Sequence, residues 1–436
     1  MECAGNSTGS LDCARDDVRI VRTRVVVPME GEPIENGAVA IAGNRIAGVG
    51  RFEEIRASHG GEVLDLGEQV LLPGLINAHC HLDYTLLRGQ IPPQRSFTDW
   101  IRAINASKAA LSEEDYVASI DTGLAEAQKF GTTALLNLEA FPELLPRISR
   151  PSLRVSWCAE MIDIRKRVPV PKVSENLREW FDSHSGWLGG FGLAPHAPFT
   201  ASVELFAEAS EISRKYRVPM TTHVAESREE MQMFRDANGP LYDFLGSLGR
   251  RMDDCGGHTP LSFLVESQVL DEHWILAHLN ELTEGDFDLL ARAARFQIAH
   301  CPRSHTFFGH TPFELRRLQT LGFNICLGTD SLASNSSLSL FSEMRELLRK
   351  EPWFSPREAL AMITVNAARA IGQADALGKI SPGFRADLIA IPCAETGRGV
   401  FETIVAFDGP VPWTMVDGEI LSLRLGVGAS GMKILN

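Results

Sequence analysis

The chain has 436 residues, of which 44% are hydrophobic and 22% are charged, a composition typical of globular proteins and unlike that of disordered chains. Its net charge is −14, and its 42 Lys and Arg residues are scattered rather than gathered in runs. These features argue against a protein that binds nucleic acid or an anionic membrane surface.

The N-terminal segment, residues 1–17, is polar and is expected to form a disordered leader without the features of a secretory signal. No uncharged apolar stretch approaches the length needed to cross a membrane. The eight cysteines form no CxxC pair and mostly lie in apolar segments, which indicates buried thiols in a reducing compartment. We therefore expect a soluble, cytoplasmic protein.

Residues 18–70 read as short strands broken by Gly and Asn, as in AVAIAGNRIAGVG, and contain no long helix. Strand patterns return near the other end of the chain, in LGKISPGFRADLIAI and WTMVDGEILSL. The simplest assembly joins 18–70 and 377–425 in one small β-sandwich, followed by a tail at 426–436.

Between these segments, in residues 71–376, short apolar strands alternate with longer amphipathic segments such as SEEDYVASIDTGLAEAQKF, SVELFAEASEISRKY and SPREALAMITVNAARAIG. Eight strands can be counted, and we expect them to end at or near His79, Leu138, Glu160, His196, His223, His278, His300 and Asp330. Eight βα repeats predict an α/β protein with a closed (β/α)8 barrel, the TIM barrel.

Histidines and an aspartate recur at the ends of these strands. His79 and His81 would project to the same side of the first strand, although this pair alone fits a polar loop equally well. His223, His278 and Asp330 end the fifth, sixth and eighth strands, and catalytic groups in this fold gather at the C-terminal ends of the strands. Three imidazoles and one carboxylate would suit zinc or ferrous iron and leave room for water.

Other side chains near the strand ends could contact a substrate. Glu226 follows His223 in HVAE, where it could shuttle a proton or be a solvated residue at the start of a helix. A pocket for a flat heterocycle could also be lined by residues that follow strands four, seven and one, although ordinary packing would explain them as well: His196, His300, His305, Phe308 and Trp100.

The motifs PGLINAHCHLDYTLLRG, APHAPFTAS, HVAE, AHLNEL, HCPRSH and GTDSLASNSSL occur in this order along the chain. Together they closely resemble the amidohydrolase superfamily, specifically its adenosine-type and chlorohydrolase-like deaminases. The resemblance extends over residues 18–423 and includes the flanking sandwich.

The resemblance implies a set of roles. One divalent metal, zinc with ferrous iron as the alternative, would be bound by His79, His81, His223 and Asp330. Glu226 would shuttle a proton, Asp330 would accept the proton of the attacking water, and His278 would hydrogen-bond that water or the substrate. The fourth strand, GGFGLAPH, lacks the lysine found in many binuclear members, so one metal is implied rather than two.

The implied activity is hydrolytic deamination of an adenine-containing nucleoside or thioether, in part because of the LASNSSL segment after Asp330. The substrates in question are S-adenosylhomocysteine, 5'-methylthioadenosine and aminodeoxyfutalosine, and the partners are this heterocyclic amine and water. His305 stands where relatives often carry asparagine, which leaves the substrate open.

Several alternatives remain. They are deamination of guanine, cytosine or a pterin, dechlorination of a triazine, a non-catalytic scaffold, and a protein that binds a purine without turning it over. Triazine chlorohydrolases commonly alter the acidic positions that are Glu226 and Asp330 here. A homodimer is suggested by analogy with the fold alone.

Overall fold

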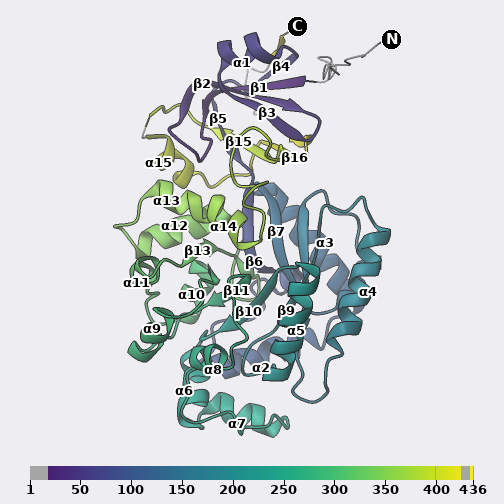
Figure 1. Ribbon diagram of the computed structural model, residues 1–436, viewed down its shortest axis with the longest axis vertical. Helices are drawn as coiled ribbons and strands as arrows, with labels where there is room; N and C mark the ends of the chain where they lie inside the picture. The colour runs from purple at the N-terminus through teal and green to yellow at the C-terminus, as the bar shows by residue number, and fades with distance from the viewer. Residues whose placement is uncertain (1–17, 398, 424–432, 436) are drawn as a thin grey trace, which may run out of the picture.

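The computed structural model describes residues 18–397, 399–423 and 433–435. The described chain forms two sheets, a parallel one surrounded by helices and a mixed one built from both ends of the chain (Figure 1). The expected leader, 1–17, lies outside the described residues, as does most of the expected tail at 426–436.

The parallel sheet is the predicted barrel. Its order is β13-β12-β11-β10-β9-β8-β7-β6-β14, and its strands are β6 (Leu75–His81), β7 (Thr132–Glu139), β8 (Arg154–Met161), β9 (Gly189–Pro195), β10 (Met220–Val224), β11 (Trp274–His278), β12 (Gln297–His300), β13 (Asn324–Leu327) and β14 (Asp330–Ser331). The last two strands are halves of the eighth barrel strand, because β13 pairs with β12 while β14 pairs with β6. The eight predicted strands and the α/β barrel fold are confirmed.

The barrel closes between its first and last strands at Gly328 and Thr329. The Thr329 amide donates to the His79 carbonyl at 3.0 Å, and the Asn77 side chain donates to Thr329 Oγ1 at 2.8 Å. A Cβ atom at Gly328 would lie 2.6 Å from the His79 carbonyl oxygen, so only glycine permits this approach.

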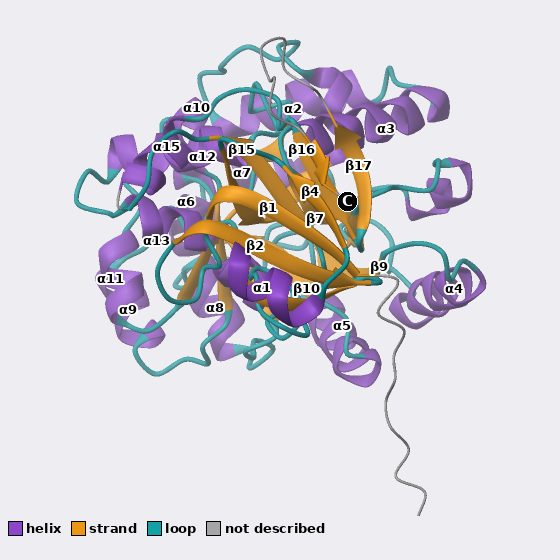
Figure 2. Ribbon diagram, turned by 90° about the horizontal axis from the view of Figure 1, so that it is seen from above, coloured by secondary structure: helices purple, strands orange, loops and turns teal. Residues whose placement is uncertain are grey.

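Helices follow the strands and surround the barrel (Figure 2). Two of them match the expected amphipathic segments and begin at serine caps, because Ser112 accepts from the Asp115 amide at the start of α3 and Ser202 from the Leu205 amide at the start of α5. The predicted helix over SPREALAMITVNAARAIG is instead two short helices, α13 and α14. The break at Ile363 and Thr364 lets the Ile363 carbonyl accept from the Ile76 amide of β6.

The helices between and after the barrel strands have the following bounds: α2 (Phe97–Lys108), α3 (Glu113–Lys129), α4 (Val170–Ser183), α5 (Val203–Tyr216), α6 (Arg228–Asp236), α7 (Pro240–Ser247), α8 (Pro260–Glu266), α9 (Glu284–Leu290), α10 (Pro302–Phe308), α11 (Leu315–Thr320), α12 (Leu340–Lys350), α13 (Pro356–Met362) and α14 (Val365–Ala370). Short 3-10 helices are η2 (Leu82–Leu87) and η3 (Pro142–Arg147). None of the helices in the described part of the chain has the length and apolar character of a membrane span.

The mixed sheet has the order β17-β16-β15-β5-β1-β2-β3, with β4 attached to β1 and β18 attached to β4. Its elements are β1 (Val18–Val26), β2 (Ile34–Ala42), β3 (Arg45–Arg51), β4 (Glu62–Asp65), β5 (Gln69–Pro73), β15 (Leu388–Pro392), β16 (Trp413–Val416), β17 (Glu419–Leu423) and β18 (Lys433–Leu435), with helices α1 (Phe52–His59) and α15 (Gly399–Ala406) beside it. The two chain ends meet where β5 pairs antiparallel with β15. A small β unit formed by both ends was therefore correctly predicted.

The boundary expected at residues 70 and 71 is wrong by three residues. VLLPGLINAH was predicted to be one barrel strand, but Gln69–Pro73 pairs with β1 and β15 of the mixed sheet, and the barrel strand begins at Leu75. The chain passes between the sheets at Gly74, where a Cβ atom would lie 2.1 Å from Thr133 Oγ1. Because the residues on both sides of Gly74 are apolar, the hydrophobicity pattern does not show where the chain passes from one sheet to the other.

Candidate metal centre

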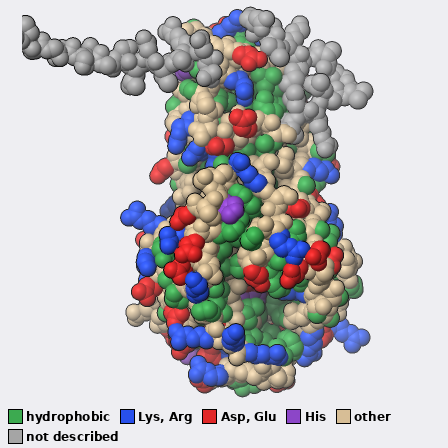
Figure 3. All heavy atoms as spheres, turned by 90° about the vertical axis from the view of Figure 1, so that its right-hand side faces the viewer, with side chains coloured by type: hydrophobic (Ala, Val, Ile, Leu, Met, Phe, Trp, Pro, Cys, Tyr) green, Lys and Arg blue, Asp and Glu red, His purple; other side chains and the backbone are tan. Residues whose placement is uncertain are grey.

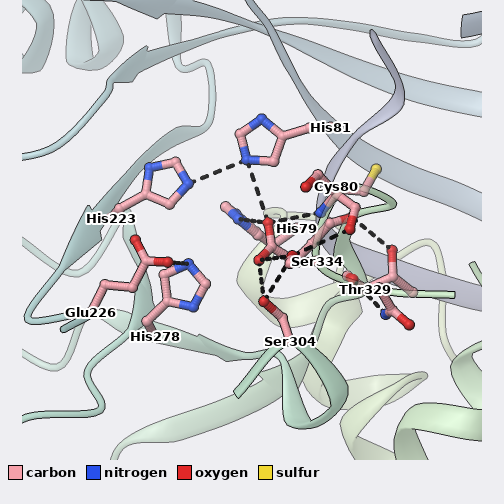
Figure 4. A network of polar contacts seen from close by, with 12 residues as sticks. His79, Cys80, His81, His223, Glu226, His278, Ser304, Thr329 and Ser334 are labelled. Carbon is pink, nitrogen blue, oxygen red and sulfur yellow. Dashed lines mark hydrogen bonds and ion pairs between the residues drawn. The ribbon is translucent and has the colours of Figure 1, made fainter. Parts of the chain in front are cut away.

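The predicted metal ligands meet at the C-terminal ends of three barrel strands. His79 and His81 lie on β6, His223 on β10 and Asp330 on β14, and all four are buried. Alternation along β6 sends both of its histidines to the barrel interior. Figure 4 shows the imidazoles of His79, His81 and His223 directed towards a common space.

The distances in this cluster suit one ion. His81 Nε2 lies 3.2 Å from His223 Nε2, close to the ~3.3 Å that separates two nitrogen ligands of a tetrahedral zinc ion. Asp330 Oδ1 lies 3.9 Å from His79 Nε2 and 3.8 Å from His81 Nε2. In the part of the chain that the structure describes, four triads of ligand atoms overlap here. Three are buried: His79, His223 and His278; His79, His81 and Asp330; and Glu226, His278 and Asp330. In the fourth, His223 is buried, whereas Glu160 and His196 are partly buried.

The polar atoms of His79 also fit a bound cation. Both ring nitrogens are buried without a hydrogen-bond partner among the described residues, and the side chain is fully inaccessible to solvent. An unpaired buried nitrogen is costly, but a metal–nitrogen bond would remove that cost. Burial and the neighbouring histidines lower the pKa of His79, so the ring is kept in the neutral form that binds metals.

A backbone carbonyl orients His223. The His196 carbonyl oxygen, at the end of β9, accepts from the His223 amide at 2.9 Å and lies 2.7 Å from His223 Nδ1. With the proton on Nδ1, the lone pair of Nε2 points at His81 and is free to bind an ion.

The Asp330 carboxylate is held on both oxygens. Ser304 and Ser334 donate to Oδ2 at 2.5 and 3.2 Å, and the Ser331 amide donates to Oδ1 at 2.8 Å. Burial alone would raise the pKa of Asp330, but His278, His79 and the Ser304 hydrogen bond outweigh it and lower the pKa. The φ of Asp330 is 56°, a left-handed conformation that is uncommon for residues other than glycine and that clusters at functional sites.

Glu226 and His278 form a second pair beside the metal ligands. Glu226 Oε1 lies 3.8 Å from His278 Nε2, an imidazole nitrogen that is buried without a hydrogen-bond partner in the described chain (Figure 4). Burial, followed by the charge of Asp330, raises the pKa of Glu226 well above its usual value. Burial lowers the pKa of His278 to about 3. Both shifts favour the uncharged form of their group.

The turns after β10 and β11 place this pair. Ala225, His278 and Leu279 all have positive φ, and the Asn280 side chain donates to the Glu226 carbonyl at 3.0 Å. The Glu226 amide donates to Glu230 Oε2 at 2.7 Å. Left-handed residues at both strand ends turn the chain sharply, so that the two side chains face each other.

The predicted substrate contacts lie at different places. The His196 ring packs 4.8 Å from the ring of His223, which puts it at the centre. Trp100 and Phe308 contact each other edge to face at 4.9 Å, and both pack in an apolar cluster with Phe199, whose ring lies 5.6 Å from that of His196. Trp100 and Phe308 therefore lie next to the centre, on the side of Phe199 and His196.

His305 has a structural bond of its own. Its Nε2 lies 2.8 Å from the Thr311 carbonyl oxygen, and its ring lies 5.3 Å from that of His300. The His300 ring in turn stacks on Phe313 at 3.9 Å. The rings of His305 and His300 thus pack against each other, and that of His300 also against Phe313, beside the ends of the strands.

Three side chains at the centre were not singled out from the sequence. Ser304 holds Asp330, and Glu160 Oε1 lies 3.9 Å from His81 Nδ1. Asp83, two residues after His81, is fully buried, and burial together with Glu160 raises its pKa to about 8. The position of Glu160 at the end of the third strand was a usable signal. Ser304 and Asp83 lie in short helices after strand ends, α10 and η2, and their residue types alone do not indicate a role.

The chain is similar to known proteins over most of its length. The model of the amidohydrolase family matches residues 70–421. The chain is 30% identical over 391 residues to a 5-methylthioadenosine/S-adenosylhomocysteine deaminase of Pyrococcus furiosus, covering 86% of this chain and 83% of that protein.

Two solved structures share the fold. An adenosine deaminase from Xanthomonas campestris with bound zinc matches with a TM-score of 0.80 and 23% identity over 94% of each chain. The Helicobacter pylori aminofutalosine deaminase in complex with methylthio-coformycin matches with a TM-score of 0.80 and 19% identity, covering 92% of this chain and all of that one.

Proposed function

This chain belongs to the amidohydrolase family, and from that premise we propose that it is a metal-dependent deaminase of adenine-containing nucleosides or thioethers. It hydrolyses a C–N bond of a cyclic amidine and releases ammonia. The observation that carries the proposal is the pair formed by Glu226 and His278, 3.8 Å apart, beside the cluster of His79, His81, His223 and Asp330.

The proposed ligands are His79, His81, His223 and Asp330, because their nitrogen and oxygen atoms converge and both ring nitrogens of His79 lack a partner among the described residues. Zinc suits this donor set, ferrous iron is the alternative, and the similar Xanthomonas campestris structure contains zinc. The ion would supply Lewis-acid activation of a water molecule.

The side chains of the chain itself would move the protons. Asp330, whose pKa is lowered, accepts the proton of the attacking water on Oδ1 or Oδ2. Glu226, whose pKa is raised, donates a proton to a ring nitrogen of the substrate, which makes the adjacent amino-bearing carbon electrophilic. His278 donates a hydrogen bond to the oxygen on which negative charge develops.

The adenine class of substrate is supported by relatives. The Pyrococcus furiosus protein is named for 5-methylthioadenosine and S-adenosylhomocysteine, and the Helicobacter pylori structure for aminofutalosine. His196 would contact the heterocycle, and Trp100 and Phe308 would close the apolar side of the pocket. His305 is proposed to contribute through packing, because its ring nitrogen is already bonded to Thr311.

Ammonia release from a panel of substrates tests the proposal. Zinc-loaded protein is assayed with adenosine, S-adenosylhomocysteine, 5'-methylthioadenosine, aminodeoxyfutalosine, guanine, cytosine, a pterin and an aminotriazine. We expect turnover of at least one adenine-containing substrate, its loss after chelation of the metal, and its return on adding zinc. A chlorotriazine is assayed in parallel for release of chloride. Release of chloride without deamination of any substrate in the panel would contradict the proposal.

A further inference from the structure

A cavity of about 930 Å³ lies at the end of the barrel opposite the metal centre. It is lined by residues at the beginnings of barrel strands, among them Arg154 of β8, Gly189 of β9 and Pro219 before β10. Its other wall includes Leu377 and Arg385, which lead into β15 of the mixed sheet. Figure 1 shows the mixed sheet at this end of the barrel, and helices α2, α6 and α7 at the other. The volume is sufficient for a ligand of nucleotide size.

Arginines dominate the charged lining of this cavity. The only acidic lining residue is Glu272, although the chain as a whole carries a net charge of −14, and six arginines line the cavity: Arg45, Arg154, Arg214, Arg217, Arg369 and Arg385. Acidic and basic side chains are interspersed on the face shown in Figure 3, so a concentration of one sign is a local feature.

Carboxylates behind the wall neutralise half of these arginines. Arg154 pairs with Asp387 and Asp417, Arg385 also pairs with Asp417, and Arg214 pairs with Asp271. The other half, Arg45, Arg217 and Arg369, form no ion pair with any residue that the structure describes. Arg45 Nη1 donates to the Gly383 carbonyl, a neutral group.

Two glycines and several apolar side chains shape the rest of the cavity. Gly189 has a φ of +103°, and a Cβ atom there would lie 2.2 Å from the Val155 carbonyl oxygen. At Gly190 a Cβ atom would meet nothing within 4 Å, so the wall is open at that position. Leu135, Phe191 and Ile371 contribute apolar surface beside the guanidinium groups.

We propose that this cavity is a second binding site and that its ligand is a small organic phosphate. Arginine forks match phosphate oxygens and would bind the anionic end through Arg217 and Arg369. The apolar wall would contact the organic end. The ligand would not touch the metal centre, because His223 lies four residues along β10 from Pro219, or roughly 13 Å at the rise of a β-strand.

Isothermal titration of the full-length protein at low salt tests the site, with ribose 5-phosphate, inorganic phosphate and ribose as probes. We expect ribose 5-phosphate to bind, ribose not to bind, and inorganic phosphate to bind more weakly. In Arg217→Ala/Arg369→Ala the affinity for ribose 5-phosphate should fall at least about tenfold, since each lost arginine removes charge-assisted hydrogen bonds.

The control is Arg51→Ala/Arg292→Ala, which removes the same charge from two exposed positions outside the cavity. It should bind ribose 5-phosphate as the wild type does, and both double variants should keep the wild-type deaminase rate. Equal affinity in Arg217→Ala/Arg369→Ala and the wild type would overturn the site, as would binding of none of the probes at millimolar concentration. Binding of inorganic phosphate alone would overturn its assignment to an organic ligand.

Discussion

The carbonyl oxygen of His196 accepts the backbone amide of His223 and lies 2.7 Å from Nδ1 of the same residue. Two bonds to one oxygen fix both the strand pairing and the ring of His223. Because Nδ1 carries the proton, Nε2 of His223 keeps a free lone pair, and it lies 3.2 Å from Nε2 of His81. A backbone carbonyl group next to a neighbouring strand thus orients the ring of this proposed metal ligand.

Replacing His223 with alanine should remove most of the bound metal. The variant lacks one of the four proposed ligands, and we expect the affinity for zinc to fall by at least about 100-fold, since even changes outside the ligands cost about 10- to 100-fold. Metal content after dialysis, measured by mass spectrometry, checks this. The control is His258→Ala, an exposed histidine that should leave the metal content unchanged. Wild-type metal content in His223→Ala would exclude His223 as a ligand.

Glu226→Gln should keep the metal but lose turnover. The amide preserves the shape of the side chain but cannot transfer a proton as the carboxyl group, whose pKa is raised by burial, is proposed to do, so kcat should fall by roughly 10²- to 10⁴-fold. Steady-state ammonia release and metal content are measured on the same sample. Glu211→Gln, at an exposed position on α5, serves as the matched control. An active Glu226→Gln variant would show that the proton comes from elsewhere.

Ser304→Ala should impair catalysis through Asp330. The serine hydroxyl donates to Asp330 Oδ2 at 2.5 Å, and Ser334 is left as the only other side-chain donor to that oxygen in the described chain. We expect about a tenfold fall in kcat with little change in KM, because Ser304 is buried and its hydroxyl group bonds to Asp330. Restoration of kcat in Ser304→Thr would support a positioning role, and an equal loss in both variants would contradict it.

Arg154→Met should destabilise the protein. The change leaves Asp387, which is 5% exposed, without its guanidinium partner, and breaking a buried pair costs about 3–5 kcal/mol. Denaturation in urea measures the loss. Lys172→Met, which breaks the exposed pair with Glu175, is the control and should change stability by about 0.5 kcal/mol or less.

The same variant should show a pH dependence. Burial already raises the pKa of Asp387 in the folded protein, and removal of Arg154 would raise it further. A group whose pKa is higher in the folded than in the unfolded state favours folding when protonated, so stability falls as pH rises through that range. The deficit of Arg154→Met relative to the wild type should therefore be smaller at pH 5 than at pH 8. An equal deficit at both values would mean that Asp387 is not the source of the instability.

The barrel and its principal polar cluster could be predicted because strand ends are visible in a sequence. His223, His278 and Asp330 each close an apolar run, and the parallel arrangement brings such ends together. The passage between the sheets at Gly74 was missed because Gln69–Pro73 and Leu75–His81 are both apolar and adjacent. The pairing partners of a strand are set by tertiary contacts, which an apolar pattern does not record.

The support around the ligands was less predictable. Ser304 follows a strand end by four residues, and its hydroxyl reaches Asp330 only because α10 begins with Pro302 and turns the chain back over the barrel. Likewise, the arginines that line the second cavity are widely separated in the sequence, from Arg45 to Arg385, and only the fold brings them together. Groups that converge only through folding of both sheets leave no local pattern.

Closure of the barrel at Thr329 also sets an order for assembly of the metal centre. Asn77 and Thr329, which bond across the seam, are 252 positions apart in the chain. At ~5–20 residues per second, a ribosome would need roughly 10–50 s between making His79 and Asp330. During that interval an ion can meet the early histidines but not the complete ligand set. Stable metal capture should therefore be a late event of biosynthesis that follows closure of the barrel.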